Sequence, residues 1–175
     1  MFDTVLIAGL GLMGGSMAKT IKARTLSRVL GWNRTRATAE QALADGSIDA
    51  IATEALYKEA DLVIIGLYPQ ATVDWLLENM SKMKKGCVIV DMVGVKQFMV
   101  DHLEQAALDA GVHYVGGHPM AGREFSGLDF ALSTLFDGAS MIFVPTKSST
   151  ERVLEQLEAY FMSLGFGQTV RCTAQ

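Results

Sequence analysis

Cysteine is scarce in this sequence, with only Cys87 and Cys172 among 175 residues. The two lie far apart inside apolar runs, and no metal ligand or redox partner is spaced near either of them. This pattern disfavours both the disulfide frameworks of small secreted domains and zinc sites. We therefore expect no disulfide and no metal site, and we interpret both thiols as buried structural side chains.

Clusters of basic residues are also lacking. The 15 Lys and Arg residues are scattered along a chain whose formal net charge is −4. Proteins that bind nucleic acid or an anionic membrane surface usually gather their cations into a patch or stripe. The composition therefore favours a small-molecule partner and predicts neither nucleic-acid binding nor membrane binding.

Long hydrophobic runs are missing as well, because glycine or a charged residue interrupts each apolar stretch. None of these stretches has the length of a membrane-spanning helix. The first residues lack the basic start and the small-residue cleavage site of a secretory signal. From these features we predict a cytoplasmic location.

Apolar residues make up 50% of the chain, which is enough for a sizeable core. A chain of 175 residues fits one domain over residues 1–175 and is too short for two ordinary domains. Apolar strand-like segments alternate with segments of helical period. The predicted strands cover residues 4–8, 29–32, 62–67, 87–91, 114–115, 141–144 and 169–172. The predicted helices cover residues 13–23, 36–43, 70–83, 97–110 and 150–164.

The predicted strands are apolar nearly throughout, as a parallel sheet covered on both faces requires. The alternating order therefore predicts an α/β fold of the Rossmann type, with a doubly wound and mainly parallel sheet. A polar, glycine-rich stretch at 118–138 is longer than most connections and is a candidate functional loop.

A glycine motif directly follows the first strand and opens the first helix, which is the context that a dinucleotide-binding fingerprint requires. Its first glycine suits a tight turn, its second lets a pyrophosphate approach the backbone, and its third permits close helix–strand packing. The N-terminus of the helix adds free N–H groups and a favourable dipole. The predicted cofactor-binding residues here are Gly9, Leu10, Gly11, Leu12, Met13 and Gly14.

The end of the second strand usually decides between the two dinucleotides, because a carboxylate there binds the ribose 2′-hydroxyl of NAD. This chain has Asn33 at that point, followed by Arg34, Thr35 and Arg36. Asparagine removes the charge that would repel a 2′-phosphate, and the two arginines can pair with one. We therefore predict that these four residues bind the cofactor and that NADP is preferred over NAD.

A second block, GGHPMAGREFSG at 116–127, is followed by LFDGA at 135–139. Together with the glycine motif, it resembles the prephenate/arogenate dehydrogenase family over the whole chain. The resemblance implies an oxidative decarboxylation in tyrosine biosynthesis. In that reaction a hydride leaves the ring carbon that bears the hydroxyl, carbon dioxide departs and the ring becomes aromatic.

Such a reaction needs a group that accepts the proton or a hydrogen bond from the substrate hydroxyl, and a neutral imidazole suits this role near pH 7. We expect His118 to follow a strand at the head of the glycine-rich loop, where open α/β sheets bind their ligands. By resemblance, His118 is the catalytic histidine. His102 and His113 lack this context and receive no role.

The family's motif after the fifth strand commonly reads Asp-x-x-Ser-Val-Lys, and its serine orients the catalytic histidine. This chain reads DMVGVK from Asp91 to Lys96, so Gly94 replaces the serine. The hydroxyl is therefore missing beside His118, unless water replaces it, while the glycine backbone still allows close approach of the nicotinamide.

The resemblance also implies contacts by Glu124 and by the loop after the strand at 62–67. Glu124 matches a position in a polar network at the entrance of the family's active site, and its neighbour Arg123 is, by its charge, a candidate for attracting an anionic substrate. Each of the two is, on its own, an ordinary solvated loop charge. The loop at Leu67, Tyr68 and Pro69 corresponds to the one that lines the cofactor's ribose side.

Two other readings stay open. A β-hydroxyacid or imine reductase shares the Gly-Leu-Gly-x-Met-Gly fingerprint but lacks the 116–127 block and uses a lysine on a later helical domain. A non-catalytic NADP-binding or redox-sensing module agrees with the short length and with Gly94. The sequence does not separate prephenate from arogenate.

The family continues beyond such a strand into a helical domain that completes the substrate pocket and forms a homodimer. We expect this C-terminal helical dimerisation domain to be absent from residues 1–175, which would leave the isolated chain able to bind nucleotide but poor in turnover.

Overall fold

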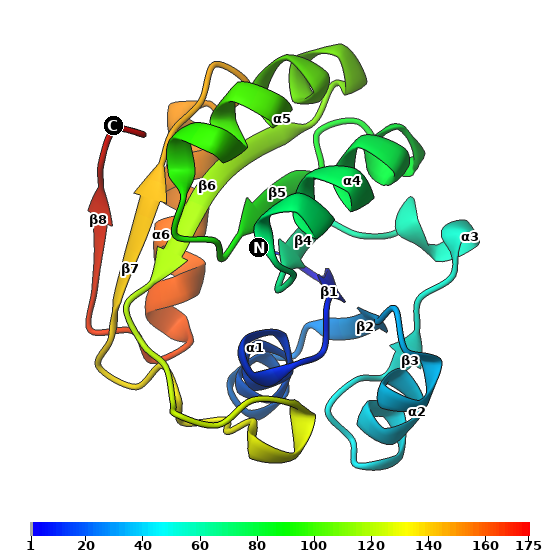
Figure 1. The fold of residues 1–175 in the computed structure, drawn as a ribbon. Coiled ribbons are helices and arrows are strands. Elements are labelled where there is room, and N and C mark those ends of the chain that lie inside the picture. The colour runs from blue at the N-terminus through cyan, green and yellow to red at the C-terminus, as the bar shows by residue number, and fades with distance from the viewer. Residues whose placement is uncertain (1) are drawn as a thin grey trace.

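The computed structural model describes residues 2–175, which form one eight-stranded sheet with helices on both faces (Figure 1). The strands are β1 Thr4–Ala8, β2 Arg28–Trp32, β3 Ala50–Ile51, β4 Leu62–Ile65, β5 Val88–Asp91, β6 His113–Pro119, β7 Ser140–Val144 and β8 Gln168–Arg171. The helices are α1 Leu12–Arg24, α2 Arg36–Ala44, α3 Glu54–Tyr57, α4 Pro69–Asn79, α5 Lys96–Ala110 and α6 Glu151–Ser163, with short 3₁₀ helices η1 Met80–Lys82 and η2 Leu128–Phe130.

The strand order is β3-β2-β1-β4-β5-β6-β7-β8. Within residues 2–175 all neighbouring strands run parallel except β6 and β7. The direction in which strands are added reverses between β1 and β4, and in this type of sheet ligands bind at that switch point, outside the carboxyl ends of the strands. The predicted Rossmann-type, mainly parallel fold is therefore confirmed.

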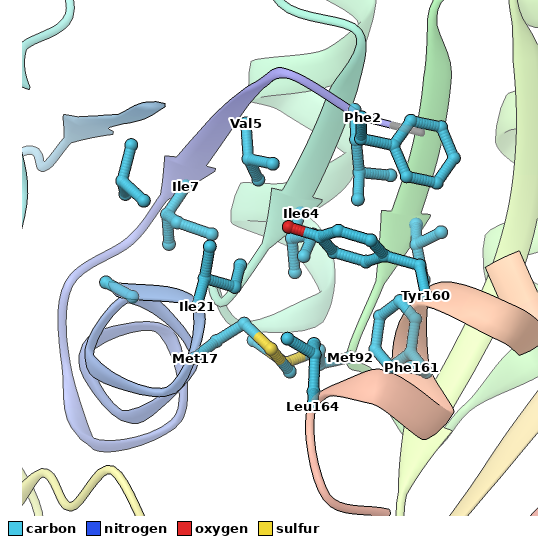
Figure 2. Close-up of a cluster of buried hydrophobic side chains, with 14 of the residues drawn as sticks. Phe2, Val5, Ile7, Met17, Ile21, Ile64, Met92, Tyr160, Phe161 and Leu164 are labelled. Carbon is cyan, nitrogen blue, oxygen red and sulfur yellow. The ribbon is translucent and has the colours of Figure 1, made fainter. Parts of the chain in front are cut away.

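Two apolar cores lie on opposite faces of the sheet. One packs α1, α2 and α6 against it, and the other packs α3, α4 and α5 (Figure 1). Figure 2 shows the first core. Met17 and Ile21 of α1 lie in it together with Tyr160 of α6 and with Leu164, which directly follows α6. No helix in the described part of the chain is long and apolar enough to cross a bilayer.

Several local predictions were wrong. The two-residue strand β3 and the one-turn helix α3 were missed, and the predicted helix at 70–83 ends at Asn79 and continues as η1. The sixth strand extends to Pro119, because β7 pairs with its second half in the antiparallel direction. His118 therefore belongs to the last residues of β6 rather than to the loop after it.

The prediction for the two thiols was right for one of them. Cys87 is buried, and burial raises the pKa of its thiol to about 12, so it stays protonated at neutral pH. Cys172 is exposed just after the edge strand β8, where no neighbouring strand covers it. Its apolar sequence context was therefore a poor guide to burial.

Candidate active site

The glycine-rich turn between β1 and α1 has a geometry that only glycine fits. Gly9 has φ +94° and donates its N–H to the Trp32 carbonyl at 2.8 Å, which fixes the turn against the end of β2. A Cβ on Gly14 would lie 1.6 Å from the carbonyl oxygen of Gly9. The tight turn and the close helix–strand packing predicted from the motif are both present.

The start of α1 leaves room and N–H groups for an anion. A Cβ on Gly11 would meet no described atom within 4 Å, so the space beside this backbone is open. No side chain caps the helix, and its first turn carries no acidic residue. The first N–H groups of a helix have no partner inside the helix, so those of Leu12 and Met13 are suited to a pyrophosphate.

Asn33 has a structural function that the sequence did not reveal. Its side-chain oxygen accepts the Leu10 N–H at 2.9 Å, and its amide nitrogen donates to the Thr35 carbonyl at 3.0 Å. Asn33 thus ties the glycine-rich turn to the connection after β2. A carboxylate could accept the first bond but could not donate the second. The Leu10 side chain is fully buried, so only its backbone faces the turn.

The two arginines after β2 differ in their surroundings. Arg36 forms an exposed i,i+4 ion pair with Glu40 at 3.2 Å. Arg34 is exposed and forms no ion pair or side-chain hydrogen bond with any described residue. Of the two, Arg34 is the one whose guanidinium is available to a ligand.

The β4–α4 connection reaches the same turn. A Cβ on Gly9 would lie 2.8 Å from Leu67 Cδ2, so the predicted loop does contact the glycine motif. Tyr68 caps α4 and is 86% exposed, and Pro69 opens the helix. The side chain of Tyr68 is therefore free to cover a bound nucleotide.

His118 and Gly94 are brought together at the carboxyl end of the sheet. A Cβ on Gly94 would lie 3.3 Å from His118 Cε1 and 3.7 Å from its Nδ1. This Nδ1 is buried and has no hydrogen-bond partner within residues 2–175, whereas Nε2 is not buried in this way. The structure thus shows the consequence of the missing serine, because a hydroxyl at position 94 would lie within reach of the unpaired nitrogen.

We predict that Gly94→Ser preserves or raises kcat, whereas Gly94→Ala does not raise it. The two variants add the same Cβ, which fits after a shift of a few tenths of an ångström, and only serine adds a hydrogen bond to Nδ1. One such bond corresponds to a serine-over-alanine advantage of about 2- to 10-fold in kcat. Steady-state kinetics of both variants measures it. Equal losses in the two would mean that the site needs the open space of glycine.

A buried charged network supports the loop that carries Gly94. Asp91 is fully buried and forms an ion pair with Lys96, which is also buried. The Asp91 carboxylate also accepts the Val93 N–H at 2.8 Å and the Tyr114 hydroxyl at 2.5 Å. Charge, backbone and hydroxyl contacts therefore fix the 91–96 segment beside His118.

The pKa shifts agree with this burial. Burial lowers the pKa of Lys96, and the Asp91 carboxylate opposes this effect. Burial raises the pKa of Tyr114 well above its usual range, and Asp91 adds to the rise, so its phenol stays protonated as the donor. The 91–96 motif was evident in the sequence, but it predicted no role for Asp91 or Lys96. A charged residue at each end of a strand-to-helix turn was the available signal.

Arg123 and Glu124 lie in the loop after β6. Arg123 donates to the Phe130 carbonyl at 2.6 Å, and its guanidinium lies 5.4 Å from the centre of the Phe125 ring. Glu124 is exposed. No hydrogen bond or ion pair joins either side chain to His118 in the described chain, so the structure brings together His118 and Gly94 but not these two.

The site fits a bound dinucleotide from the turn to the histidine. An open anion-binding turn, a ribose-side loop and a half-exposed imidazole all lie at the carboxyl ends of the parallel strands. In the described residues no three metal-ligating side chains form a cluster. The fold and site define a Rossmann-type domain of the dinucleotide-binding class.

The comparisons with known proteins identify the family. The family model described as prephenate dehydrogenase, nucleotide-binding domain, matches residues 17–168. The chain belongs to this family. A prephenate dehydrogenase from Bacillus subtilis is 38% identical over 162 residues, which are 90% of this chain and 43% of that protein.

Solved structures agree with the assignment. An arogenate dehydrogenase from Synechocystis has a TM-score of 0.88 and 25% identity, covering 98% of this chain and 60% of that one. The prephenate dehydrogenase from A. aeolicus, in complex with hydroxyphenyl propionate and NAD⁺, has a TM-score of 0.88 and 25% identity, covering 99% and 61%. This chain spans about half the length of the curated relatives that it matches.

Proposed function

We propose that this protein catalyses the oxidative decarboxylation of prephenate or arogenate, with hydride transfer to a nicotinamide dinucleotide, in tyrosine biosynthesis. The observation that carries the proposal is the placement of His118. Its imidazole lies near the carboxyl end of β6, at the same edge of the sheet as the glycine-rich turn, with Nδ1 buried against Gly94 and Nε2 left to face a ligand. A family dehydrogenase needs a proton acceptor at such a position.

In this mechanism, a nicotinamide dinucleotide held at the start of α1 would supply the acceptor for the hydride from the substrate carbon that bears the hydroxyl. His118 accepts the hydroxyl proton, or a hydrogen bond from it, as the hydride leaves. The bond to the ring carboxylate then breaks, carbon dioxide departs, and its electron pair completes the aromatic ring. The free N–H groups at the start of α1 would hold the pyrophosphate, while the Asp91–Lys96 pair keeps Gly94 in place beside the imidazole.

The substrate is tested by measuring kcat/KM for prephenate and arogenate in the natural full-length protein. Turnover of either supports the proposal, and the larger value identifies the substrate. A β-hydroxyacid serves as the comparison substrate, because the reductase alternative predicts turnover of that compound alone. Saturable dinucleotide binding with no turnover of any of the three would favour the binding or redox-sensing module, which the unpaired Nδ1 of His118 also permits.

We also propose that NADP is the preferred cofactor, through Arg34. The support is its exposed guanidinium, which lacks any partner in residues 2–175, and the absence of a carboxylate at Asn33. A salt bridge to a 2′-phosphate is available to Arg34, while Arg36 already pairs with Glu40.

We predict that Arg34→Ala weakens NADP⁺ binding by about tenfold, on the scale of one charge-assisted hydrogen bond, and leaves NAD⁺ binding within about twofold. Calorimetry with both dinucleotides measures this ratio. Arg152→Ala, an equal change of charge on α6, is the matched control and should leave both affinities unchanged. An unchanged ratio in Arg34→Ala would remove Arg34 from cofactor selection.

We propose that substrate binding also uses a part of the family's length that this chain does not cover, and that a homodimer forms through that part in the cytoplasm. Prephenate has two carboxylates, which need cationic donors when they leave water. In the loop after β6, Arg123 is the cation nearest in sequence to His118, and one of its nitrogens already donates to Phe130. Additional donors from outside residues 1–175 would complete the pocket.

A further inference from the structure

A cavity of about 310 Å³ joins two parts of the chain that are far apart in sequence. One wall is the glycine-rich turn together with the end of β2. A second wall is α2, and the third is the start of η2 in the loop after β6. The lining residues are Leu10, Gly11, Asn33, Thr38, Gln41, Gly127, Leu128 and Asp129. A dinucleotide with its pyrophosphate on Gly11 would place its adenosine ribose here.

Asp129 is the one acidic residue in this lining. The Gln41 side-chain amide donates to its Oδ1 at 2.6 Å, so the carboxylate is held against α2 in the cavity that Asn33 also lines. The cavity beside the end of β2, where Asn33 replaces the usual carboxylate, therefore contains a carboxylate from the glycine-rich loop after β6.

The segment that carries Asp129 is anchored to α1, next to which it runs in Figure 1. Leu128 is buried, and its Cδ1 would lie only 2.8 Å from a Cβ on Gly15, so this glycine makes the approach possible. The Leu132 N–H donates to Ser16 Oγ at 3.0 Å. These contacts, together with the bond from Gln41, define where the carboxylate sits.

We propose that Asp129 is a second determinant of cofactor choice, acting against Arg34. Its carboxylate accepts hydrogen bonds from ribose hydroxyls and repels a 2′-phosphate, so it favours NAD and limits the preference for NADP. This inference rests on the proposed binding of a nicotinamide dinucleotide. It assigns a function in cofactor selection to the loop that follows β6, the strand that contains His118.

The test is the binding of NAD⁺ and NADP⁺ to Asp129→Asn, measured by calorimetry. Asparagine keeps an oxygen for Gln41 and removes only the charge. We expect the ratio of NADP⁺ affinity to NAD⁺ affinity to rise about two- to fivefold, which is the scale of one exposed charge interaction. The rise should shrink at 1 M salt, where the Debye length is about 3 Å.

Asp109→Asn is the matched control, because Asp109 also accepts a side-chain bond from a glutamine, Gln105 at 2.9 Å, but lies at the end of α5. It should leave the ratio unchanged. An unchanged ratio in Asp129→Asn, or equal weakening of both dinucleotides at every salt concentration, would overturn the role of Asp129. Failure of the unaltered protein to bind either dinucleotide would overturn the proposed function as well, so the two failures are distinguishable.

Discussion

Replacing His118 with Asn in the natural full-length protein is expected to lower kcat by about 100-fold or more, the lower end of the range for loss of general acid–base catalysis. Asparagine cannot accept the hydroxyl proton. The affinities for NAD⁺ and NADP⁺ should stay within a few-fold, because the proposed nucleotide contacts lie in the turns after β1 and β2 and not in β6. Steady-state kinetics and calorimetry on the same preparation measure both quantities.

The control is His102→Asn, which alters an exposed histidine of α5 that bonds to its own helix. It should leave kcat unchanged. If His118→Asn lowered kcat and dinucleotide affinity by similar factors, the imidazole would be structural.

Replacing Lys96 with Met is expected to lower the free energy of unfolding by about 3–5 kcal/mol, because it leaves the Asp91 carboxylate fully buried without its cation. The remaining bonds from Val93 and Tyr114 do not neutralise the charge. Urea denaturation measures the change. Adding Asp91→Asn to Lys96→Met removes the unpaired charge and should recover part of the lost stability.

Lys82→Met is the matched control for charge and shape. Lys82 pairs with Glu54 at 2.7 Å, but both side chains are at least 32% exposed. Surface pairs of this kind contribute about 0–1 kcal/mol. A loss for Lys96→Met no larger than the loss for Lys82→Met would show that the buried pair does not stabilise the 91–96 segment.

The parts of this fold that sequence could predict are those in which local chemistry decides. The turn from Gly9 to Gly14 was predictable because the spacing of glycines alone sets its backbone geometry and close packing. The apolar strands of the sheet were predictable because burial on both faces removes polar residues from them. The missing serine hydroxyl at Gly94 could be predicted only because the surrounding motif resembles that of a known family.

Other features depend on pairings that no local pattern records. The strand β7 runs antiparallel to β6 and pairs with its second half, so β6 extends far enough to include His118. This extension depends on which strand lies beside β6, and the local sequence does not record that. Asp129 meets Gln41 across 88 residues of sequence, so neither residue differs locally from a solvated side chain. Asn33 looked like a missing carboxylate, although its amide makes two bonds that organise the turn.

The central claim is that dinucleotide reduction and decarboxylation occur together at His118. The direct test is to incubate the natural full-length protein with prephenate or arogenate and with NAD⁺ or NADP⁺, and to measure reduced dinucleotide and released carbon dioxide in the same reaction. The account predicts equal molar amounts of the two products for at least one substrate, and loss of both in His118→Asn. Dinucleotide binding without either product, or equal turnover by His118→Asn, would contradict it.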